Sequence, residues 1–232
     1  MFIKQGLGFA RPPAVTESSG SPATEQSRST ATERSRSLVP EPSRSPATER
    51  SRGLVPERSR GHSILEVGFG TGLNALLAMR WAEEHQVYVH FTTLETNVLS
   101  PALAAQLNYA SSEKERSDFL KIHTCAWNED VAITPHFTLH KVHRRVQDEQ
   151  AVDEYDVVFY DAFGPPTQPE MWTLAIFQRM FAALKPGGIF VTYCAKGQVR
   201  RDLQAAGFTV ERLPGPPGKR EMLRATKPLL HG

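Results

Sequence analysis

The stretch Ile64-Leu-Glu-Val-Gly-Phe-Gly-Thr-Gly-Leu-Asn74 decides the fold of this chain. Its first four residues form a short apolar run that glycines bound, which is typical of a buried parallel strand. Residues 73–85 carry apolar side chains at helical spacing, and residues 87–94 return to a strand rich in β-branched and aromatic residues. Because no hairpin signal separates these segments, the sequence predicts a βαβ unit with the glycines in its first turn.

The chain that follows continues the alternation of strands and helices. Residues 111–135 are irregular and predict no element, whereas Ser100 and Pro101 are typical of a helix start. The other predicted elements are strands at 137–142 and 155–160, a helix from the capping box Thr167-Gln-Pro-Glu170 to Pro186, a strand at 189–194, a helix at 199–206, and strands at 208–213 and 221–226. A mostly parallel α/β sheet with a C-terminal antiparallel hairpin is the Rossmann-like arrangement of class I S-adenosylmethionine (SAM)-dependent methyltransferases.

The N-terminal quarter of the chain is a repeat. The octapeptide PATEQSRS at 22–29 recurs in variant form four more times, up to Gly61, with Glu fourth, Ser sixth and Arg seventh in every copy. Octads of mostly Ser, Arg, Pro, Thr and Glu bury too little apolar surface to offset the entropy of ordering the backbone. We therefore predict a disordered octapeptide-repeat tail at 1–61 and a methyltransferase domain at 62–232. The Ser-Arg pairs could instead touch RNA phosphates, but the glutamates dilute their charge.

Charge and cysteine content exclude several classes of protein. The tail carries ten basic and six acidic residues, and the domain is slightly acidic except for residues 196–232, which hold eight basic and three acidic residues. No run of eighteen apolar residues is present, and the polar start lacks the apolar core of a signal peptide, so we expect a soluble, cytoplasmic protein. Cys125 and Cys194 have no C-x-x-C spacing, which argues against a disulfide framework or a thiolate zinc site and predicts two buried thiols.

Gly68, Gly70 and Gly72 predict a ligand site at the start of the first helix. Glycines let the backbone approach a ligand closely, and the amide groups at a helix N-terminus face an anionic group. A dinucleotide fingerprint requires a further glycine where Leu73 stands, so the pattern favours a nucleoside ligand without a pyrophosphate, such as SAM. A tight turn with no ligand is the alternative.

Two acidic residues are candidates for the same cofactor site. Glu95 ends the second strand, where a carboxylate can accept hydrogen bonds from both ribose hydroxyls, although it could also be a solvated acid. Glu66 lies within the first strand, and it either holds the glycine turn or contacts the methionyl amine through water. A buried carboxylate needs a partner in both cases.

Asp161 follows the strand at 155–160 and is the candidate catalytic residue. Methyl transfer is an in-line displacement that needs an aligned, deprotonated nucleophile. A carboxylate at this position can orient an amine and accept its proton, which no hydroxyl, thiol or metal in this stretch could do. The alternative is that Asp161 only caps its loop.

Basic residues gather in two C-terminal segments. The helix start after the strand at 189–194 and the loop of the final hairpin should lie on the same rim, where five side chains could bind an anion such as a nucleic-acid phosphate, or simply be solvated. These candidate substrate-binding residues are Lys196, Arg200, Arg201, Lys219 and Arg220.

Taken together, the domain resembles the methyltransferase of the tRNA 5-methylaminomethyl-2-thiouridine biosynthesis family (the MnmC family, in its stand-alone MnmD-like form). The resemblance rests on residues 64–74, on Tyr160-Asp-Ala-Phe-Gly-Pro-Pro166 with Pro169-Glu-Met-Trp172, on residues 197–204 and 206–208, and on Gly218-Lys-Arg-Glu-Met222. It implies methylation of the aminomethyl group on the wobble uridine of tRNA, with Asp161 in the catalytic position and Glu66, the glycines and Glu95 around SAM. Bifunctional members add a flavin-dependent oxidase domain, so a separate oxidase acting upstream is an expected partner.

The chain departs from the family pattern at two places. Only Phe2-Ile-Lys-Gln-Gly-Leu7 looks like the end of the family's N-terminal segment, and the octads lie between it and Ile64. An acid that contacts adenine after the third strand is not evident, because Lys141-Val-His143 occupies that region. The alternatives are therefore a methyltransferase for a small amine and an inactive, SAM-binding remnant.

Overall fold

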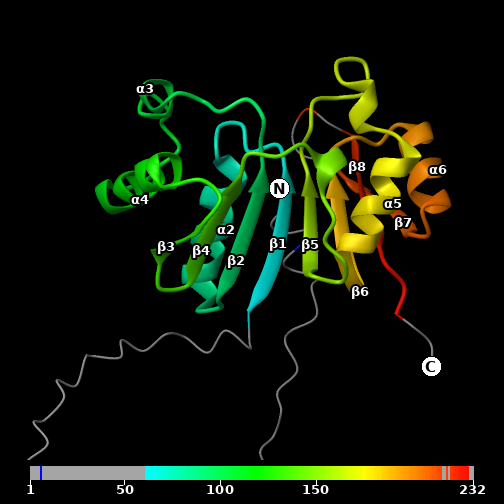
Figure 1. Cartoon of the computed structure of the whole chain (residues 1–232), viewed down its shortest axis with the longest axis horizontal. Helices are drawn as coiled ribbons and strands as arrows, with labels where there is room; N and C mark the ends of the chain where they lie inside the picture. The colour runs from blue at the N-terminus through cyan, green and yellow to red at the C-terminus, as the bar shows by residue number, and fades with distance from the viewer. Residues whose placement is uncertain (1–5, 7–60, 216–217, 219, 230–232) are drawn as a thin grey trace, which may run out of the picture.

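The computed structural model describes Gly6, residues 61–215, Gly218 and residues 220–229 (Figure 1). The predicted repeat tail at 1–61 lies outside these residues apart from Gly6 and Gly61, so its disorder stays a prediction. The same holds for the candidate substrate-binding residue Lys219.

Strands and helices alternate through the described chain. The strands are β1 (His62–Val67), β2 (Val89–Leu94), β3 (Asp130–Thr134), β4 (Phe137–Val142), β5 (Tyr155–Tyr160), β6 (Leu184–Thr192), β7 (Thr209–Pro214) and β8 (Glu221–Thr226). The α-helices are α2 (Leu73–His85), α3 (Pro101–Ala104), α4 (Glu113–Thr124), α5 (Leu174–Ala183) and α6 (Gly197–Ala205), and short 3-10 helices lie at η2 (Val146–Asp148) and η3 (Pro169–Met171).

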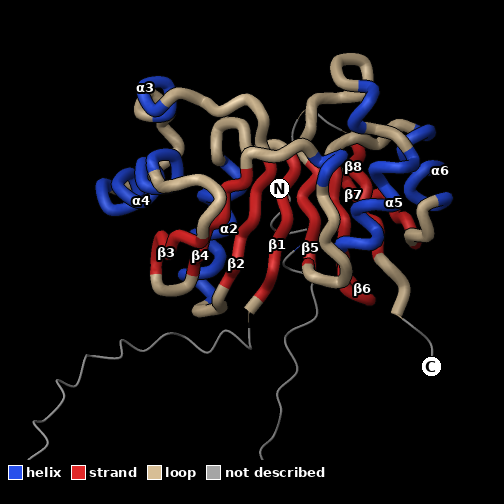
Figure 2. The backbone as a smooth tube through the Cα atoms, in the orientation of Figure 1, coloured by secondary structure: helices blue, strands red, loops and turns tan. Residues whose placement is uncertain are grey.

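One twisted sheet runs through the centre of the domain (Figure 2). Its strand order is β3-β4-β2-β1-β5-β6-β8-β7. The five inner strands from β4 to β6 are parallel, whereas β3 pairs antiparallel with β4, and β8 pairs antiparallel with both β6 and β7. The predicted class I methyltransferase arrangement, with its C-terminal antiparallel hairpin, is therefore confirmed.

Helices cover both faces of the sheet and bury two apolar cores. In Figure 1, α2 lies behind the sheet and α5 in front of it. Buried side chains of α2 and α4, such as Leu76 and Phe119, pack in one core with Phe91 and Phe159. The other core joins the buried residues of α5 and α6 to the opposite face of β5 and β6. The central strands are buried on both faces, as parallel strands usually are.

The start of α5 differs from the prediction. The capping box at 167–170 does not begin this helix; Pro169 instead opens the one-turn η3. The α-helix begins at Leu174, because the hydroxyl group of Thr173 caps it by accepting a hydrogen bond from the amide of Ile176 at 3.4 Å. A proline fits the first turn of a 3-10 helix as well as that of an α-helix, so the sequence pattern does not separate the two.

The region that predicted no element contains α4 and β3. The side chain of Ser112 accepts a hydrogen bond from the amide of Glu115, which starts α4 in the way that serine caps usually do. Cys125 follows α4 and is only half-buried, whereas Cys194 is buried, so the prediction of two buried thiols is right for Cys194 alone. In the part of the chain described here, no helix is long and apolar enough to cross a membrane.

Candidate functional site

A cavity of about 630 Å³ opens at the carboxyl ends of the parallel strands. Ligands of α/β sheets bind at this edge, on either side of the point where the strand order reverses. Four chain segments and η3 contribute to its walls, and the lining residues fall within 67–74, 94–97, 144–147, 161–163 and 168–171.

The turn between β1 and α2 forms one wall of the cavity. Gly68, Gly70 and Gly72 all have positive φ angles, of 93°, 50° and 70°, which glycine adopts without strain. At Gly68 space is short as well, because an added Cβ atom would lie 3.1 Å from the carbonyl oxygen of Asp161. The predicted glycine turn thus lies against the strand end that carries the predicted catalytic residue.

Glu95 lies at the end of β2 and lines the cavity. One carboxylate oxygen accepts a hydrogen bond from the amide of Gly70 at 3.1 Å. The other accepts hydrogen bonds from the amides of Thr96 and Asn97, each at 2.7 Å. The carboxylate is therefore fixed in place. Oε1 already accepts two hydrogen bonds, whereas Oε2 accepts one and keeps a lone pair for a ligand hydroxyl.

Asp161 lies at the end of β5 and also lines the cavity. Its amide donates a hydrogen bond to the carbonyl oxygen of Val67 at 3.1 Å, which joins the ends of β5 and β1. Its carboxylate accepts a hydrogen bond from the side-chain amide of Asn74 at 3.0 Å. Asn74, in the first turn of α2, therefore orients the carboxylate toward the mouth of the sheet.

Glu66 is completely buried and does not line the cavity. Its Oε2 atom accepts a hydrogen bond from the hydroxyl of Thr93 at 2.8 Å, and its Oε1 atom accepts none from the residues that the structure describes. Burial, the largest influence, raises the pKa of Glu66 to about 8; the Thr93 hydrogen bond lowers it and the nearby Asp161 carboxylate raises it. This position keeps Glu66 out of direct contact with a ligand in the cavity, and its hydrogen bond with Thr93 joins β1 to β2.

The predicted basic rim is separate from the cavity walls. Lys196 precedes α6 and is exposed, and Arg200 and Arg201 lie in its first turns. The guanidinium group of Arg201 donates a hydrogen bond to the side chain of Gln198 at 2.8 Å. Of the described rim residues, none lines the cavity.

Arg220 approaches the same rim from the other segment. It lines a shallow, open depression together with Tyr193 and Ala195, which directly precedes Lys196. The hydroxyl of Tyr193 donates a hydrogen bond to the carbonyl oxygen of Ala162 at 2.8 Å, and Ala162 lines the cavity. The depression and the cavity are therefore neighbours, and the rim lies beside the cavity.

Several residues of the cavity could not be predicted from the sequence. Asn74 ends the glycine-rich stretch, but its bond to Asp161 depends on the fold. Arg144 and Arg145 line the cavity after β4, where the sequence shows no adenine contact. Each pairs with an acid close in sequence, Arg144 with Glu149 at 3.4 Å and Arg145 with Asp148 at 3.1 Å. In the sequence, two loop arginines with acidic residues nearby look the same as ordinary surface residues, so nothing predicted that they line the cavity.

The cavity fits SAM in size and in the kinds of donor and acceptor it offers. Its volume lies within the usual range for small-molecule sites. Glu95 offers a fixed carboxylate at the strand end, and the glycine turn lets the backbone approach a ligand closely. Glu95 and the glycine turn are the residues that would hold the cofactor, with Glu66 beneath them.

Comparison with known proteins agrees with this geometry. A family model described as S-adenosyl-L-methionine-dependent methyltransferase matches residues 111–228. The tRNA 5-methylaminomethyl-2-thiouridine biosynthesis bifunctional protein MnmC of Pseudomonas fluorescens is 37% identical over 169 residues, which cover 68% of this chain and 26% of that protein. The protein of the same name from Chromobacterium violaceum is 34% identical over 170 residues, which cover 69% of this chain and 26% of that protein. The chain thus spans about a quarter of the length of these relatives.

A solved structure shares the fold. The crystal structure of MnmC2 from Aquifex aeolicus matches with a TM-score of 0.58 and 24% sequence identity, and the match covers 74% of this chain and 55% of that chain. At this identity the likeness shows the fold alone.

The raised pKa of Glu66 predicts how stability depends on pH. A folded-state pKa of about 8, above the ordinary value of 4.5, means that the folded protein holds this proton more tightly than the unfolded chain does. The contribution of Glu66 to stability is then largest below pH 4.5 and is lost as the pH rises toward 8. Glu66→Gln removes this dependence, so between pH 5 and 8 the variant should gain stability over the wild type by on the order of 1 kcal/mol per pH unit.

Urea unfolding at several pH values measures this difference. Glu84→Gln, on the exposed side of α2, is the control and should follow the wild type at every pH. If the Glu66→Gln and wild-type curves stay parallel from pH 5 to 8, the pKa of Glu66 is not raised.

Proposed function

The chain belongs to this family of S-adenosyl-L-methionine-dependent methyltransferases, and from that premise we propose that it methylates the aminomethyl group on the wobble uridine of tRNA. The proposed reaction converts 5-aminomethyl-2-thiouridine to 5-methylaminomethyl-2-thiouridine. It is supported by the names of the relatives that match about two thirds of the chain. Because those relatives are described as bifunctional, a separate flavin-dependent oxidase acting upstream belongs to the same proposal, as does a cytoplasmic location.

One observation carries the proposal: two carboxylates face one cavity from opposite sides of the glycine turn. Gly70 in this turn donates a hydrogen bond to Glu95, and Asn74 just after it donates one to Asp161. Glu95 stands at the end of β2 and Asp161 at the end of β5, with β1 between them. A donor held at Glu95 and an acceptor amine held at Asp161 would therefore lie in the same cavity.

The chemistry required of the chain is modest. SAM supplies a methyl group on a sulfonium, which is already an activated leaving group. An alkylamine has an ordinary pKa of about 10 and arrives protonated at neutral pH, without a lone pair for attack. Asp161 can pair with the ammonium group, fix the direction of the nitrogen, and accept its proton or pass it to water. Asn74 holds the carboxylate in place for this step.

Asp161→Asn tests this role because it keeps the size of the side chain and one acceptor while it removes the charge. Single-turnover methylation should fall by on the order of a hundredfold or more, the usual range for a positioned acid or base. SAM affinity should change much less, and a higher pH should recover part of the rate by deprotonating the amine in solution. Mass spectrometry of nucleosides from tRNA incubated with protein and SAM measures the product.

The control for this variant is Asp153→Asn, which changes an aspartate beside the other end of β5 and should methylate like the wild type. If Asp161→Asn also methylates tRNA at close to the wild-type rate, Asp161 is only a loop cap. If the wild type itself yields no methylated nucleoside from tRNA that carries the aminomethyl group, the proposed reaction is wrong, and an inactive SAM-binding protein becomes the better interpretation.

Glu95→Ala tests the cofactor site. The variant should weaken SAM binding by about 1 to 3 kcal/mol, the cost of losing charged hydrogen bonds to the ribose. Isothermal titration calorimetry measures the affinity, and Glu84→Ala on α2 serves as the matched control. Unchanged SAM affinity in Glu95→Ala would remove the ribose assignment.

The basic rim separates tRNA from a small amine as the substrate. Binding of tRNA should weaken steeply with salt, because each phosphate contact releases counterions. Arg200→Ala with Arg201→Ala should reduce the slope of log affinity against log salt by about 1 for each phosphate that the variant no longer binds. The control pair Lys114→Ala with Arg116→Ala changes two basic residues on α4, far along the chain from the rim, and should keep the wild-type slope. Equal slopes in both double variants would show that the rim binds no phosphate. An equal salt response of tRNA binding and small-amine turnover would remove the argument for tRNA.

A further inference from the structure

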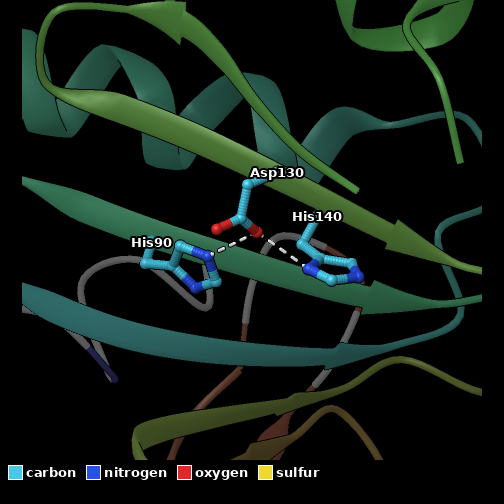
Figure 3. Close-up of side chains that lie close together, drawn as sticks. All are labelled: His90, Asp130 and His140. Carbon is cyan, nitrogen blue, oxygen red and sulfur yellow. Dashed lines mark hydrogen bonds and ion pairs between the residues drawn. The ribbon is translucent and has the colours of Figure 1, made fainter. Parts of the chain in front are cut away.

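Three metal-ligating side chains lie close together outside the cavity. His90 of β2, Asp130 of β3 and His140 of β4 point toward one another on one face of the sheet (Figure 3). The Oδ1 atom of Asp130 lies 2.9 Å from Nε2 of His90 and 2.8 Å from Nδ1 of His140. One ligand atom from each residue lies within 4.8 Å of the other two.

The strand register brings these residues together. Asp130 is directly opposite His140 in the antiparallel pair of β3 and β4. His90 is opposite Thr138 in the parallel pair of β2 and β4, and Thr138 is two residues before His140. Because side chains alternate between faces with a period of two, all three project from the same face of adjacent strands. Backbone hydrogen bonds of the sheet therefore fix the spacing of the cluster.

We propose that His90, Asp130 and His140 bind a divalent transition-metal cation, with Zn²⁺ as the best match. Zn²⁺ takes imidazole nitrogens at about 2.0–2.1 Å and carboxylate oxygens at about 2.0–2.2 Å, in tetrahedral geometry. Tetrahedral ligands at those lengths are about 3.3 Å apart, so the two contacts to Asp130 need to open by about half an ångström. The three side chains are partly exposed, which leaves room for that adjustment and a water molecule in the fourth position.

The kinds of ligand select the cation. Two imidazoles with one carboxylate suit Zn²⁺, Co²⁺ or Ni²⁺, whereas Mg²⁺ and Ca²⁺ prefer oxygen ligands alone. Binding requires a lone pair on Nε2 of His90 and on Nδ1 of His140, so each neutral ring carries its proton on the other nitrogen when the metal is bound. On binding, the hydrogen bonds from the two rings to Asp130 are replaced by three metal–ligand bonds, and a proton held on either ligating nitrogen moves to the other ring nitrogen or to water.

The proposed site is independent of methyl transfer. None of the three residues lines the cavity, and His90 stands near the start of β2, whereas the cavity begins at its last residue, Leu94. A cation here would join β3, at one edge of the sheet, to β4 and β2. Its expected effect is therefore on the stability of that edge.

Calorimetry on the full chain, treated with a chelator and then dialysed, tests the site with Zn²⁺ as the probe. The wild type should bind one equivalent of Zn²⁺ that His90→Ala and His140→Ala lose or bind at least about tenfold more weakly. Mg²⁺ should give no saturable binding. A hundredfold excess of Zn²⁺ over its Kd should raise the Tm of the wild type by on the order of 5 °C, and should not raise it in either variant.

Matched variants keep the test decisive. His143→Ala and His85→Ala remove histidines outside the cluster and should bind Zn²⁺ like the wild type. Asp130→Asn removes the charge with little change of shape, so it tests the site even if an alanine variant does not fold, which circular dichroism detects. The proposal is overturned if the cluster variants fold and bind Zn²⁺ as the wild type does, or if the wild type binds none. In either case the three residues form only an ion-paired cluster.

Discussion

The close approach of the chain at Gly68 to the chain at Asp161 is the constraint on which the rest of the site depends. The amide of Gly68 donates a hydrogen bond to the carbonyl of Leu94, and the amide of Asp161 donates one to the carbonyl of Val67. The ends of β2, β1 and β5 are thereby held together beside the glycine turn. A side chain at residue 68 would force these strand ends apart, since its Cβ atom would press on the backbone of Asp161. The distance between the cavity wall at Glu95 and the wall at Asp161 would then change.

The central part of the fold could be predicted from the sequence because its signals are local. The bounds of α2, β4 and β5 match the predicted ranges, and β1 and β2 differ by two residues at their starts. These segments carry dense apolar runs or a clear helical period, and glycines or polar residues bound them. The places of Glu95 and Asp161 followed from the same reasoning, because parallel strands bring their carboxyl ends to one edge.

Features that depend on tertiary contacts could not be predicted. Helix α4 begins with charged residues and buries only Phe119, Ile122 and His123. Its apolar residues are therefore too few to show a helical period in the sequence. Because the sequence did not predict β3, it could not predict that Asp130 lies opposite His140. The two residues face each other only through the register of that strand. The buried position of Glu66 is a similar case, since an acid in an apolar strand can face either a ligand or the core.

The place of β8 in the sheet has a consequence for how the chain folds. Among the strands of the described residues β8 comes last along the chain, but it lies between β6 and β7 and pairs with both. Until it is inserted, the edge of β6 that it covers has unpaired amide and carbonyl groups, and an exposed strand edge is a template for aggregation. During synthesis this edge stays open until the chain has grown past residue 226, after every residue that lines the cavity has already been made. The nascent protein is thus most exposed to misassembly when its cavity is nearly complete.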